Sequence, residues 1–376
     1  MSLMDVLNAA ERWIGVLAER QRLASSRRRA AALTGPHQLA GTSCHCPSTL
    51  AFHHVHSEAI RECADIVIDY GSNVENPRRP QLPVALIARF APMIPRGAVV
   101  HVKTDHLAEF EAVIVPQLQA PIVLVTGDSD MAPVLAHGGL LEHPMIGHWF
   151  AQNCDLGAPH PRLTPIPIGL DNPVYTKFEK RLGFLVDAIA GRSRFDPHFS
   201  TNDTGNQRRF NAAADLSRAA IGKKPLAVLC TFHMNHRIAP DISQLPDRVA
   251  AAAALRGSPV CHFVPRRLPQ QDCWRLHESF AFEASPQGNG IDCFRTWEAL
   301  ALGTVPIVRT GPLDRLYREH GFPVAIVKAW AEVTAERLAA WAEELVPQLV
   351  PSRQKLSAGY WTSLIRARAV AIRAAI

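Results

Sequence analysis

The chain of 376 residues lacks any run of about 18 uninterrupted apolar residues, and it lacks a recognisable signal peptide. These two absences predict a cytoplasmic protein that does not span a membrane. Its eight cysteines are scattered along the sequence, and several fall in predicted strands or helices, where cysteine behaves as a small apolar residue. The cysteine spacing therefore indicates no disulfide framework.

Two kinds of sequence motif are also missing. No Gly-x-Gly-x-x-Gly pattern follows an early predicted strand, which argues against an enzyme that uses a dinucleotide. No recognised nucleic-acid motif accompanies the small excess of basic over acidic residues, 40 − 34 = 6. The net positive charge therefore favours anionic small ligands or an anionic membrane surface, and we expect no nucleic-acid partner.

Short apolar runs alternate with helical segments from residue 66 onward, which predicts parallel sheets with helices on both faces. The predicted strands of the first half are 66–70, 98–102, 122–125 and 163–168, with helices at 107–119 and 132–150. The predicted strands of the second half are 226–230, 260–264, 280–284, 305–308 and 324–327. The length suits two domains of ~150 residues each.

We therefore predict an α/β fold with two Rossmann-like doubly wound domains facing a cleft, and a ligand at the carboxyl ends of the strands. The predicted boundaries are a helical or loop lead at 1–60, a first Rossmann-like domain at 61–195, a linker at 196–222, a second Rossmann-like domain at 223–350 and a C-terminal helix at 351–376. The polar composition around the linker is typical of an inter-domain connection.

The arginine-rich lead leaves two interpretations open. Residues 1–33 carry apolar side chains on one side of a predicted helix, so the segment either packs on a protein surface or makes peripheral contact with anionic lipid at the inner face of the membrane. A nearby segment is dense in residue types that ligate zinc, namely Cys44, His45, Cys46, His53, His54 and His56. Its spacing departs from that of zinc fingers, so we interpret it mainly as a loop.

The most informative segment is residues 285–308, which combines a strand end, a glycine-rich turn, a helix and a buried strand. Gly288 and Gly290 flank Asn289, so a ligand can approach a backbone that has no Cβ atom at two positions. Asp292 is the predicted N-cap of the following helix, and the free N–H groups at such a helix start bind anions. Turns of this kind also occur in α/β proteins without a ligand.

The helix after this turn is predicted to begin at residue 293 and to end at Gly303. Arg295 in its first turn would face a phosphate, and Glu298 would accept hydrogen bonds from ribose hydroxyls. The spacing suits a nucleoside diphosphate, although Arg295 and Glu298 would also suit an ordinary ion pair within the helix. Together with the loop after strand 226–230, the predicted ligand-binding residues are Ser285, Gly288, Asn289, Gly290, Asp292, Arg295, Glu298, Asn235 and Arg237.

The same segment matches the pattern Pro-x-Gly-Asn-Gly-x-Asp-x-x-Arg-x-Trp-Glu-Ala-Leu-x-x-Gly-x-x-Pro-Ile-Val. In this it resembles the exostosin-like glycosyltransferases and the related ribitol xylosyltransferase group, closely over residues 280–330 and more loosely over 123–172. Gln287 departs from that family, in which a basic residue is common at this position.

The resemblance implies the GT-B architecture and an inverting hexosyl- or pentosyltransferase. Such an enzyme moves a sugar from a nucleotide-diphosphate donor to a hydroxyl of a glycan, glycolipid or other glycoconjugate acceptor. The predicted ligand-binding residues then become donor-binding residues. We expect neither a cofactor nor a metal.

A base for the acceptor proton is expected in the first domain. The predicted strand 121–126 is followed by Gly127-Asp128-Ser129-Asp130, and two neighbouring carboxylates can raise the pKa of one of them. We predict Asp130 as the base and rank Asp128 second, while both also suit a turn or helix cap. The pair mimics the metal-binding Asp-x-Asp of GT-A glycosyltransferases, which is a minor alternative.

His148 is a further candidate base, and Trp149 and Asn153 are candidate acceptor-binding residues, because a tryptophan can stack on a sugar ring. The competing interpretations are a core position for Trp149 and a surface position for His148. The alternative function is a non-catalytic nucleotide-sugar or glycan-binding protein of the same fold. Residue spacing encodes neither the sugar, the nucleobase, the acceptor nor the oligomeric state.

Overall fold

The computed structural model describes residues 54–68, 88–170, 205–234, 246–264 and 268–375. All of them belong to one compact unit that begins at residue 48. The arginine-rich residues 1–33 lie outside the described part of the chain. None of the described helices is both long enough and apolar enough to cross a membrane.

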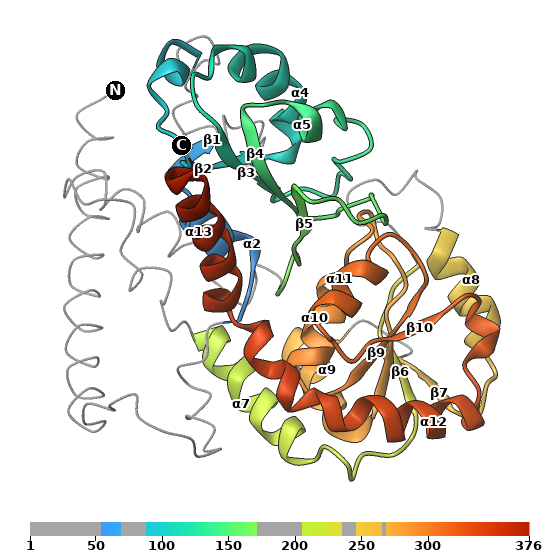
Figure 1. The fold of residues 1–376 in the computed structure, drawn as a ribbon. Helices are drawn as coiled ribbons and strands as arrows, with labels where there is room; N and C mark the ends of the chain where they lie inside the picture. Colours follow the sequence, from blue (N-terminus) through green and yellow to red (C-terminus); the bar gives the residue numbers. More distant parts are fainter. Residues whose placement is uncertain (1–53, 69–87, 171–204, 235–245, 265–267, 376) are drawn as a thin grey trace, which may run out of the picture. The chain divides into compact units, whose positions relative to one another are not determined.

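Within the described residues, the first sheet has five parallel strands that follow one another in chain order (Figure 1). They are β1 (Ile66–Ile68), β2 (Val99–Lys103), β3 (Ile122–Gly127), β4 (Ile146–Ala151) and β5 (Leu163–Pro165). All six residues of β3 are buried, as expected for a central strand of a parallel sheet with both faces covered. The register places Val125 beside His101 and Phe150.

Different segments cover the two faces of this sheet. One face packs on the chain around η2 (Ala91–Met93), η3 (Thr104–His106), α4 (Leu107–Glu109), η4 (Phe110–Ile114), η5 (Val115–Gln117) and α5 (Gly139–Glu142). The other face packs on α2 (Ser57–Glu62) and the C-terminal helix α13 (Ala358–Ala374), which runs beside the strands in Figure 1. Because side chains alternate along a strand, Leu124 joins the cluster with Phe110, and Val125 joins the cluster with Ile365.

Asp65 holds α13 against the first sheet. Its carboxylate accepts a hydrogen bond of 2.7 Å from Arg366 Nη1 and one of 2.8 Å from the backbone N–H of Val99 in β2. Arg373 Nη2, about two turns further along α13, lies 3.5 Å from the same carboxylate. The last helix of the chain is therefore part of the first domain's structure.

The second sheet also has five parallel strands: β6 (Val228–Cys230), β7 (Cys261–Phe263), β8 (Phe282–Ala284), β9 (Val305–Arg309) and β10 (Ala325–Val327). Their order across the sheet is β10-β9-β8-β6-β7. The chain thus moves outward from β6 to β7 in one direction and from β8 to β10 in the other. This sheet is doubly wound, and its switch point lies between β6 and β8.

Several helices of the described residues accompany the second sheet (Figure 1). They are α7 (Gly205–Ala219), α8 (Pro246–Leu255), α9 (Gln270–Leu276), α10 (Phe294–Ala301), α11 (Asp314–Glu319) and α12 (Ala335–Leu345). Short 3-10 segments connect them, namely η7 (His277–Ser279), η8 (Trp330–Glu332), η9 (Val346–Leu349) and η10 (Pro351–Leu356). Within the predicted linker, residues 205–219 form α7, which packs on α9.

The predicted fold class is confirmed: the chain is α/β, with two Rossmann-like parallel sheets in tandem, as in the GT-B architecture. The two sheets differ in strand order and therefore in how their faces are covered by helices. In the first sheet all strands are added in one direction, so α2 and α13 supply the cover of its second face. In the second sheet the strand order itself is that of a doubly wound fold.

One predicted helix, residues 132–150, is wrong. The structure has only the four-residue helix α5 there, and residues 146–151 form β4 instead. Gly138, Gly139 and Pro144 interrupt a helix, whereas the apolar and aromatic residues that follow suit a buried strand. This difference changes the surroundings of His148 and Trp149.

The C-terminal end of α10 is capped by polar groups from the chain before β6. Arg218 Nη1 donates to the carbonyl oxygen of Leu300 (3.1 Å), and Lys224 Nζ donates to those of Leu302 (3.1 Å) and Gly303 (2.8 Å). Burial lowers the pKa of Lys224 to about 7. Donor groups at this end satisfy carbonyls that the helix leaves unpaired, so they fix the position of α10.

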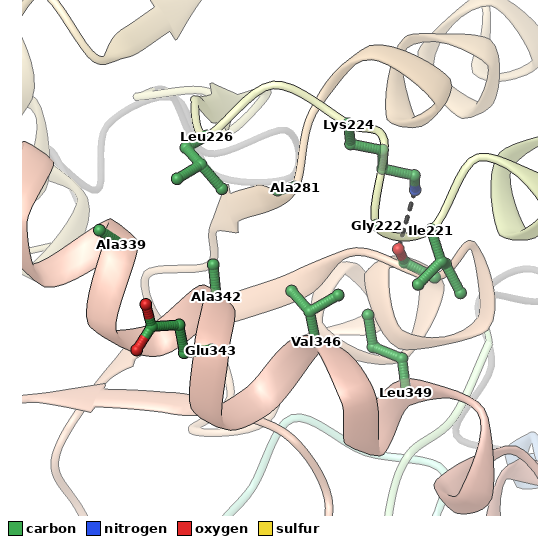
Figure 2. Close-up of a pocket in the computed structure, with 11 residues that line it drawn as sticks. Ile221, Gly222, Lys224, Leu226, Ala281, Ala339, Ala342, Glu343, Val346 and Leu349 are labelled. Atoms are coloured by element: carbon green, nitrogen blue, oxygen red, sulfur yellow. Dashed lines mark hydrogen bonds between the residues drawn. The ribbon is translucent and has the colours of Figure 1, made fainter.

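A cavity of about 300 Å³ lies beside Lys224 (Figure 2). Leu226, Ala342 and Val346 contribute to its mainly apolar wall, and Figure 2 shows the Lys224 side chain directed at a backbone oxygen. The cavity is at the amino ends of β6 and β8, because Lys224 and Ala281 precede those strands. A doubly wound sheet binds its ligand at the opposite edge.

Candidate functional site

The carboxyl ends of β6 and β8 form the edge at which a doubly wound sheet binds ligands, because the chain leaves the two strands in opposite directions there. Thr231 directly follows β6, and Ser285 directly follows β8. The glycine-rich turn at 286–290 and the start of α10 come next in the chain. The structure therefore brings the predicted ligand-binding turn to the switch point.

Arg295, in the first turn of α10, is anchored above this edge. Its Nε donates to Thr231 Oγ1 (3.3 Å), and its Nη1 donates to the carbonyl oxygen of Pro286 (3.5 Å). Its Nε also lies 3.9 Å from Glu283 Oε1, and the side chain is 17% exposed. A guanidinium that is held through Nε can present its remaining N–H groups to an anion.

Arg248 in α8 adds a second guanidinium to the site. Its Nη1 donates to the carbonyl oxygen of His233 (2.8 Å), and its Nε donates to that of Gln287 in the glycine-rich turn (3.2 Å). Burial and the positive charge of Arg295 lower the pKa of Arg248. The two groups therefore repel each other, and an anion bound beside both would relieve that repulsion.

Asp247, the neighbour of Arg248 in α8, also fixes the glycine-rich turn. Its Oδ2 accepts a hydrogen bond from the backbone N–H of Gln287 (2.9 Å), and its Oδ1 accepts from Trp330 Nε1 (2.9 Å) and from Arg309 Nε (2.9 Å). Sequence patterns did not identify Asp247 or Arg248, because both lie on a helix about 40 residues before the turn. Their position after the strand at the switch point is the signal that could have indicated them.

Both glycines of the turn lie close to other protein segments. A Cβ atom at Gly290 would lie 2.7 Å from Asn153 Oδ1 and 3.1 Å from the carbonyl oxygen of Asp130, and one at Gly288 would lie 2.9 Å from Arg248 Nη2. Neither glycine has a positive φ. At Gly290, which is buried, the missing Cβ atom therefore makes room for another protein segment and not for a ligand. At Gly288 the approach of a ligand stays a prediction.

Asp292 is not the N-cap of α10 and does not face a ligand, because it is 4% exposed. Cys293 occupies the N-cap position. The Asp292 carboxylate accepts hydrogen bonds from Trp297 Nε1 (2.9 Å), from the N–H of Cys293 (2.8 Å) and, across 124 residues, from the N–H of Ile168 (3.0 Å). Burial raises its pKa to about 6. We correct the donor-binding prediction for Asp292 to a structural role.

Asn153 completes this junction between the chain after β4 and the glycine-rich turn. Its Oδ1 accepts a hydrogen bond from the N–H of Asp292 (2.8 Å), and its Nδ2 donates to the carbonyl oxygen of Ser129 (2.8 Å). It is 1% exposed and has φ +48°, an uncommon conformation for a residue other than glycine. Asn153 therefore links protein segments, which corrects its predicted contact with an acceptor.

Asp130 and Asp128 point to different partners. Asp130 is exposed, and its Oδ2 accepts a hydrogen bond from Asn289 Nδ2 (3.2 Å), so the predicted base lies beside the predicted turn. Asp128 has φ +57°, donates its N–H to Gln152 Oε1 (3.0 Å) and lies 3.8 Å from Arg61 Nη1. No helix begins directly after either residue, so neither is a helix cap.

The remaining predicted residues of the turn and helix lie within or beside α10. Ser285 is buried, and its Oγ lies 2.9 Å from Thr296 Oγ1. Glu298 is half-buried on α10. Asn235 and Arg237 lie outside the described residues, so their predicted phosphate contacts remain predictions.

His148 and Trp149 lie in β4, where both are buried. His148 is 2% exposed, its Nε2 lies 2.9 Å from Thr164 Oγ1, and burial lowers its pKa to about 3. Trp149 has no exposed surface and donates from Nε1 to Thr126 Oγ1 (2.9 Å). The predictions of His148 as a base and Trp149 as a sugar platform are therefore wrong, because each side chain is enclosed by the first domain.

The core position of Trp149 predicts a loss of stability on substitution. Trp149→Phe removes the hydrogen bond to Thr126 and leaves a small void, so we expect the free energy of unfolding to fall by about 1–3 kcal/mol. Urea denaturation followed by circular dichroism measures this change. Unchanged stability combined with weaker binding of glycan fragments would contradict the core assignment.

The described residues contain no group of three or more His, Cys, Asp and Glu side chains that could hold a metal ion. Of the zinc-type segment, Cys44, His45, Cys46 and His53 lie outside those residues, whereas His54 and His56 are described and buried. His56 is the N-cap of α2, where its Nδ1 accepts a hydrogen bond from the N–H of Ala59 (3.3 Å). That contact gives His56 a structural role.

Comparisons with known proteins assign the chain to no family. No family model matches it, and no curated protein matches it. A solved structure described as the crystal structure of the GtfA/B complex is similar to it, with 12% sequence identity and a TM-score of 0.35 over 78% of this chain and 62% of that chain. A likeness of this degree decides nothing about function, and the exostosin-like resemblance therefore rests on its sequence motif.

Proposed function

We propose that the chain is a glycosyltransferase that uses a nucleotide-diphosphate sugar and transfers the sugar to a hydroxyl of a glycan or glycoconjugate. The observation that carries this proposal is the pair of guanidinium groups, Arg248 and Arg295, beside the glycine-rich turn at the switch point of a doubly wound sheet. A diphosphate has the charge and the acceptor oxygens that such a pair binds best.

Each group has a defined part in this proposal. Arg295 and Arg248 bind the phosphates and stabilise the negative charge that builds up on the leaving nucleoside diphosphate. Glu298 accepts hydrogen bonds from the ribose, and Asn235 and Arg237 add polar contacts to the donor. Asp130 takes the proton of the acceptor hydroxyl, since it is exposed and is held beside the turn by Asn289.

One observation favours the non-catalytic alternative. Three residues predicted for catalysis or for acceptor binding, His148, Trp149 and Asn153, are buried, which leaves Asp130 as the exposed candidate for work on the acceptor. A nucleotide-sugar or glycan-binding protein needs no base. The GT-A alternative gains no support from the geometry, because the carboxylates of Asp128 and Asp130 face Arg61 and Asn289 respectively.

Calorimetric titration of the full chain with UDP, GDP, CDP and their common sugar conjugates, with and without EDTA, tests the proposal. We expect one nucleotide to bind, with an affinity that EDTA leaves unchanged and that Arg248→Gln lowers by about 10-fold, the effect of one charged hydrogen bond. Arg275→Gln is the matched control, because that side chain is 73% exposed and pairs only with Asp272 at 3.9 Å among the described residues.

Release of the nucleoside diphosphate from the bound donor in the presence of glycan acceptors then separates an enzyme from a binding protein. Turnover that Asp130→Asn abolishes supports the transferase. Binding without turnover supports the non-catalytic alternative. The absence of binding by every nucleotide contradicts both the transferase and a nucleotide-sugar-binding protein, and leaves only a glycan-binding protein.

A further inference from the structure

Arg295 is hydrogen-bonded to a series of polar side chains, of which His277 and Glu283 are buried. Glu283 of β8 is 1% exposed, and its Oε2 lies 2.7 Å from Nε2 of His277, which is 2% exposed. The other oxygen, Oε1, accepts a hydrogen bond of 2.6 Å from Thr231 Oγ1. Thr231 Oγ1 in turn accepts the hydrogen bond from Arg295 Nε. An unbroken path therefore runs from His277 through Glu283 and Thr231 to Arg295.

The partners of His277 determine where its protons lie. Its Nδ1 is 3.0 Å from the carbonyl oxygen of Cys273, which can only accept a hydrogen bond, so Nδ1 carries a proton. The contact between Nε2 and Glu283 then needs one further proton, which belongs either to the imidazolium or to the carboxyl group. In both cases His277 and Glu283 together carry no net charge.

The absence of net charge on the His277–Glu283 pair affects how far the charge of Arg295 is neutralised. A lone Glu283 carboxylate, buried 3.9 Å from Arg295 Nε, would have the guanidinium as its principal counter-charge. Because His277 and Glu283 together carry no net charge, the positive charge of Arg295 remains available to an anion at the sheet edge. The hydroxyl of Thr231, which donates to Glu283 and accepts from Nε, fixes the direction of the guanidinium.

A buried carboxylate in the middle of a parallel strand also calls for an explanation. Its neighbours Phe282 and Ala284 are apolar and buried, as is Leu229 on the adjacent strand, so an aliphatic residue would suit position 283. Burying a charged group is costly unless it is paired and hydrogen-bonded. The energetic cost of burying Glu283 is explained if its carboxyl group serves the hydrogen-bonded arrangement at Arg295.

We propose that His277, Glu283 and Thr231 are positioning residues that orient Arg295 and leave its charge free to bind a phosphate group. The inference rests on the proposed function only in identifying the anion as part of a nucleotide sugar. It applies equally to pyrophosphate, which is therefore the probe. If pyrophosphate binds and no sugar nucleotide does, the proposed function fails while this inference stands.

The test measures pyrophosphate affinity of the full chain by calorimetry, with folding checked by thermal denaturation. His277→Gln leaves Glu283 without a charged partner, and we expect the affinity to fall about 3- to 10-fold, the scale of one hydrogen bond. Adding Glu283→Gln removes the uncompensated carboxylate, so the double variant should recover an affinity within about 2-fold of the original. A merely structural pair would lose affinity further when both members are replaced.

A background that lacks Arg295 makes the outcome decisive. In an Arg295→Gln chain, His277→Gln should have no further effect on pyrophosphate affinity, since the path from His277 through Glu283 and Thr231 acts through Arg295. A folded His277→Gln protein with unchanged affinity, a double variant that does not recover, or an effect that persists without Arg295 would each overturn the proposal. Should His277→Gln not fold, Thr231→Val takes its place: it removes the anchor of Arg295 Nε, and unchanged pyrophosphate affinity in that variant would likewise overturn it.

Discussion

Replacing Arg295 with glutamine is expected to weaken the binding of a nucleoside diphosphate about 10- to 150-fold, since hydrogen bonds to a charged group contribute roughly 1.5–3 kcal/mol. The guanidinium is anchored by Thr231 and by the carbonyl of Pro286, so its free N–H groups meet a phosphate without further ordering. Isothermal calorimetry of the purified variant measures the loss.

Arg295→Lys separates charge from geometry. A lysine keeps the positive charge but lacks the Nε contact to Thr231, and we expect it to recover only part of the affinity. Full recovery by lysine would mean that charge alone matters and would weaken the argument for an oriented guanidinium. If the original chain and Arg295→Gln bind the nucleoside diphosphate with equal affinity, the anion does not bind at this edge of the sheet.

Replacing Asp292 with asparagine is expected to lower the free energy of unfolding by about 1–3 kcal/mol at pH 7. The carboxylate accepts hydrogen bonds from Trp297, Cys293 and Ile168, whereas an asparagine offers only one accepting oxygen and turns an NH₂ group toward the remaining donors. Urea denaturation of the variant measures the loss. Asp272→Asn, at a side chain that is 51% exposed, should change stability by less than about 0.5 kcal/mol.

The cost of this substitution should also depend on pH. Burial raises the pKa of Asp292 to about 6 in the folded chain, above the ordinary aspartate value of 3.8, so the folded state binds this proton more tightly than the unfolded state. The resulting contribution to stability is fully present below about pH 4 and is lost as the pH rises through about 6. The difference between the original chain and Asp292→Asn should therefore be larger at pH 4 than at pH 7, by up to about 3 kcal/mol. A difference that stays flat over this range would contradict a raised pKa of the buried Asp292 carboxyl group.

Local sequence patterns predicted the architecture and the neighbourhood of the site. Short apolar runs indicated all five strands of the second sheet, and Gly303, with φ +66°, ends α10 close to where its sequence predicted. Arg295 was also placed correctly, in the first turn of α10. These features depend on residues near one another in the chain, which is why spacing reveals them.

The failures have a common physical reason. His148 and Trp149 were assigned to a helix because an apolar run can form either a helix or a buried strand, and the pairing with β3 and β5 decided for the strand. Gly290 and Asp292 suggested a ligand, but their environment is set by Asn153 and Ile168, which are remote in sequence. Only contacts between distant segments distinguish a glycine that admits a ligand from one that admits a neighbouring side chain.

By itself, the sequence determined that this chain builds two parallel α/β sheets and that an arginine follows a glycine-rich turn after a strand of the second one. The tertiary structure decided which charges surround that arginine. Arg248 comes from a helix 47 residues earlier in the numbering, 295 − 248 = 47, and the balance between His277 and Glu283 exists only once both are buried together. Charge balance depends on distance and burial, and residue spacing encodes neither.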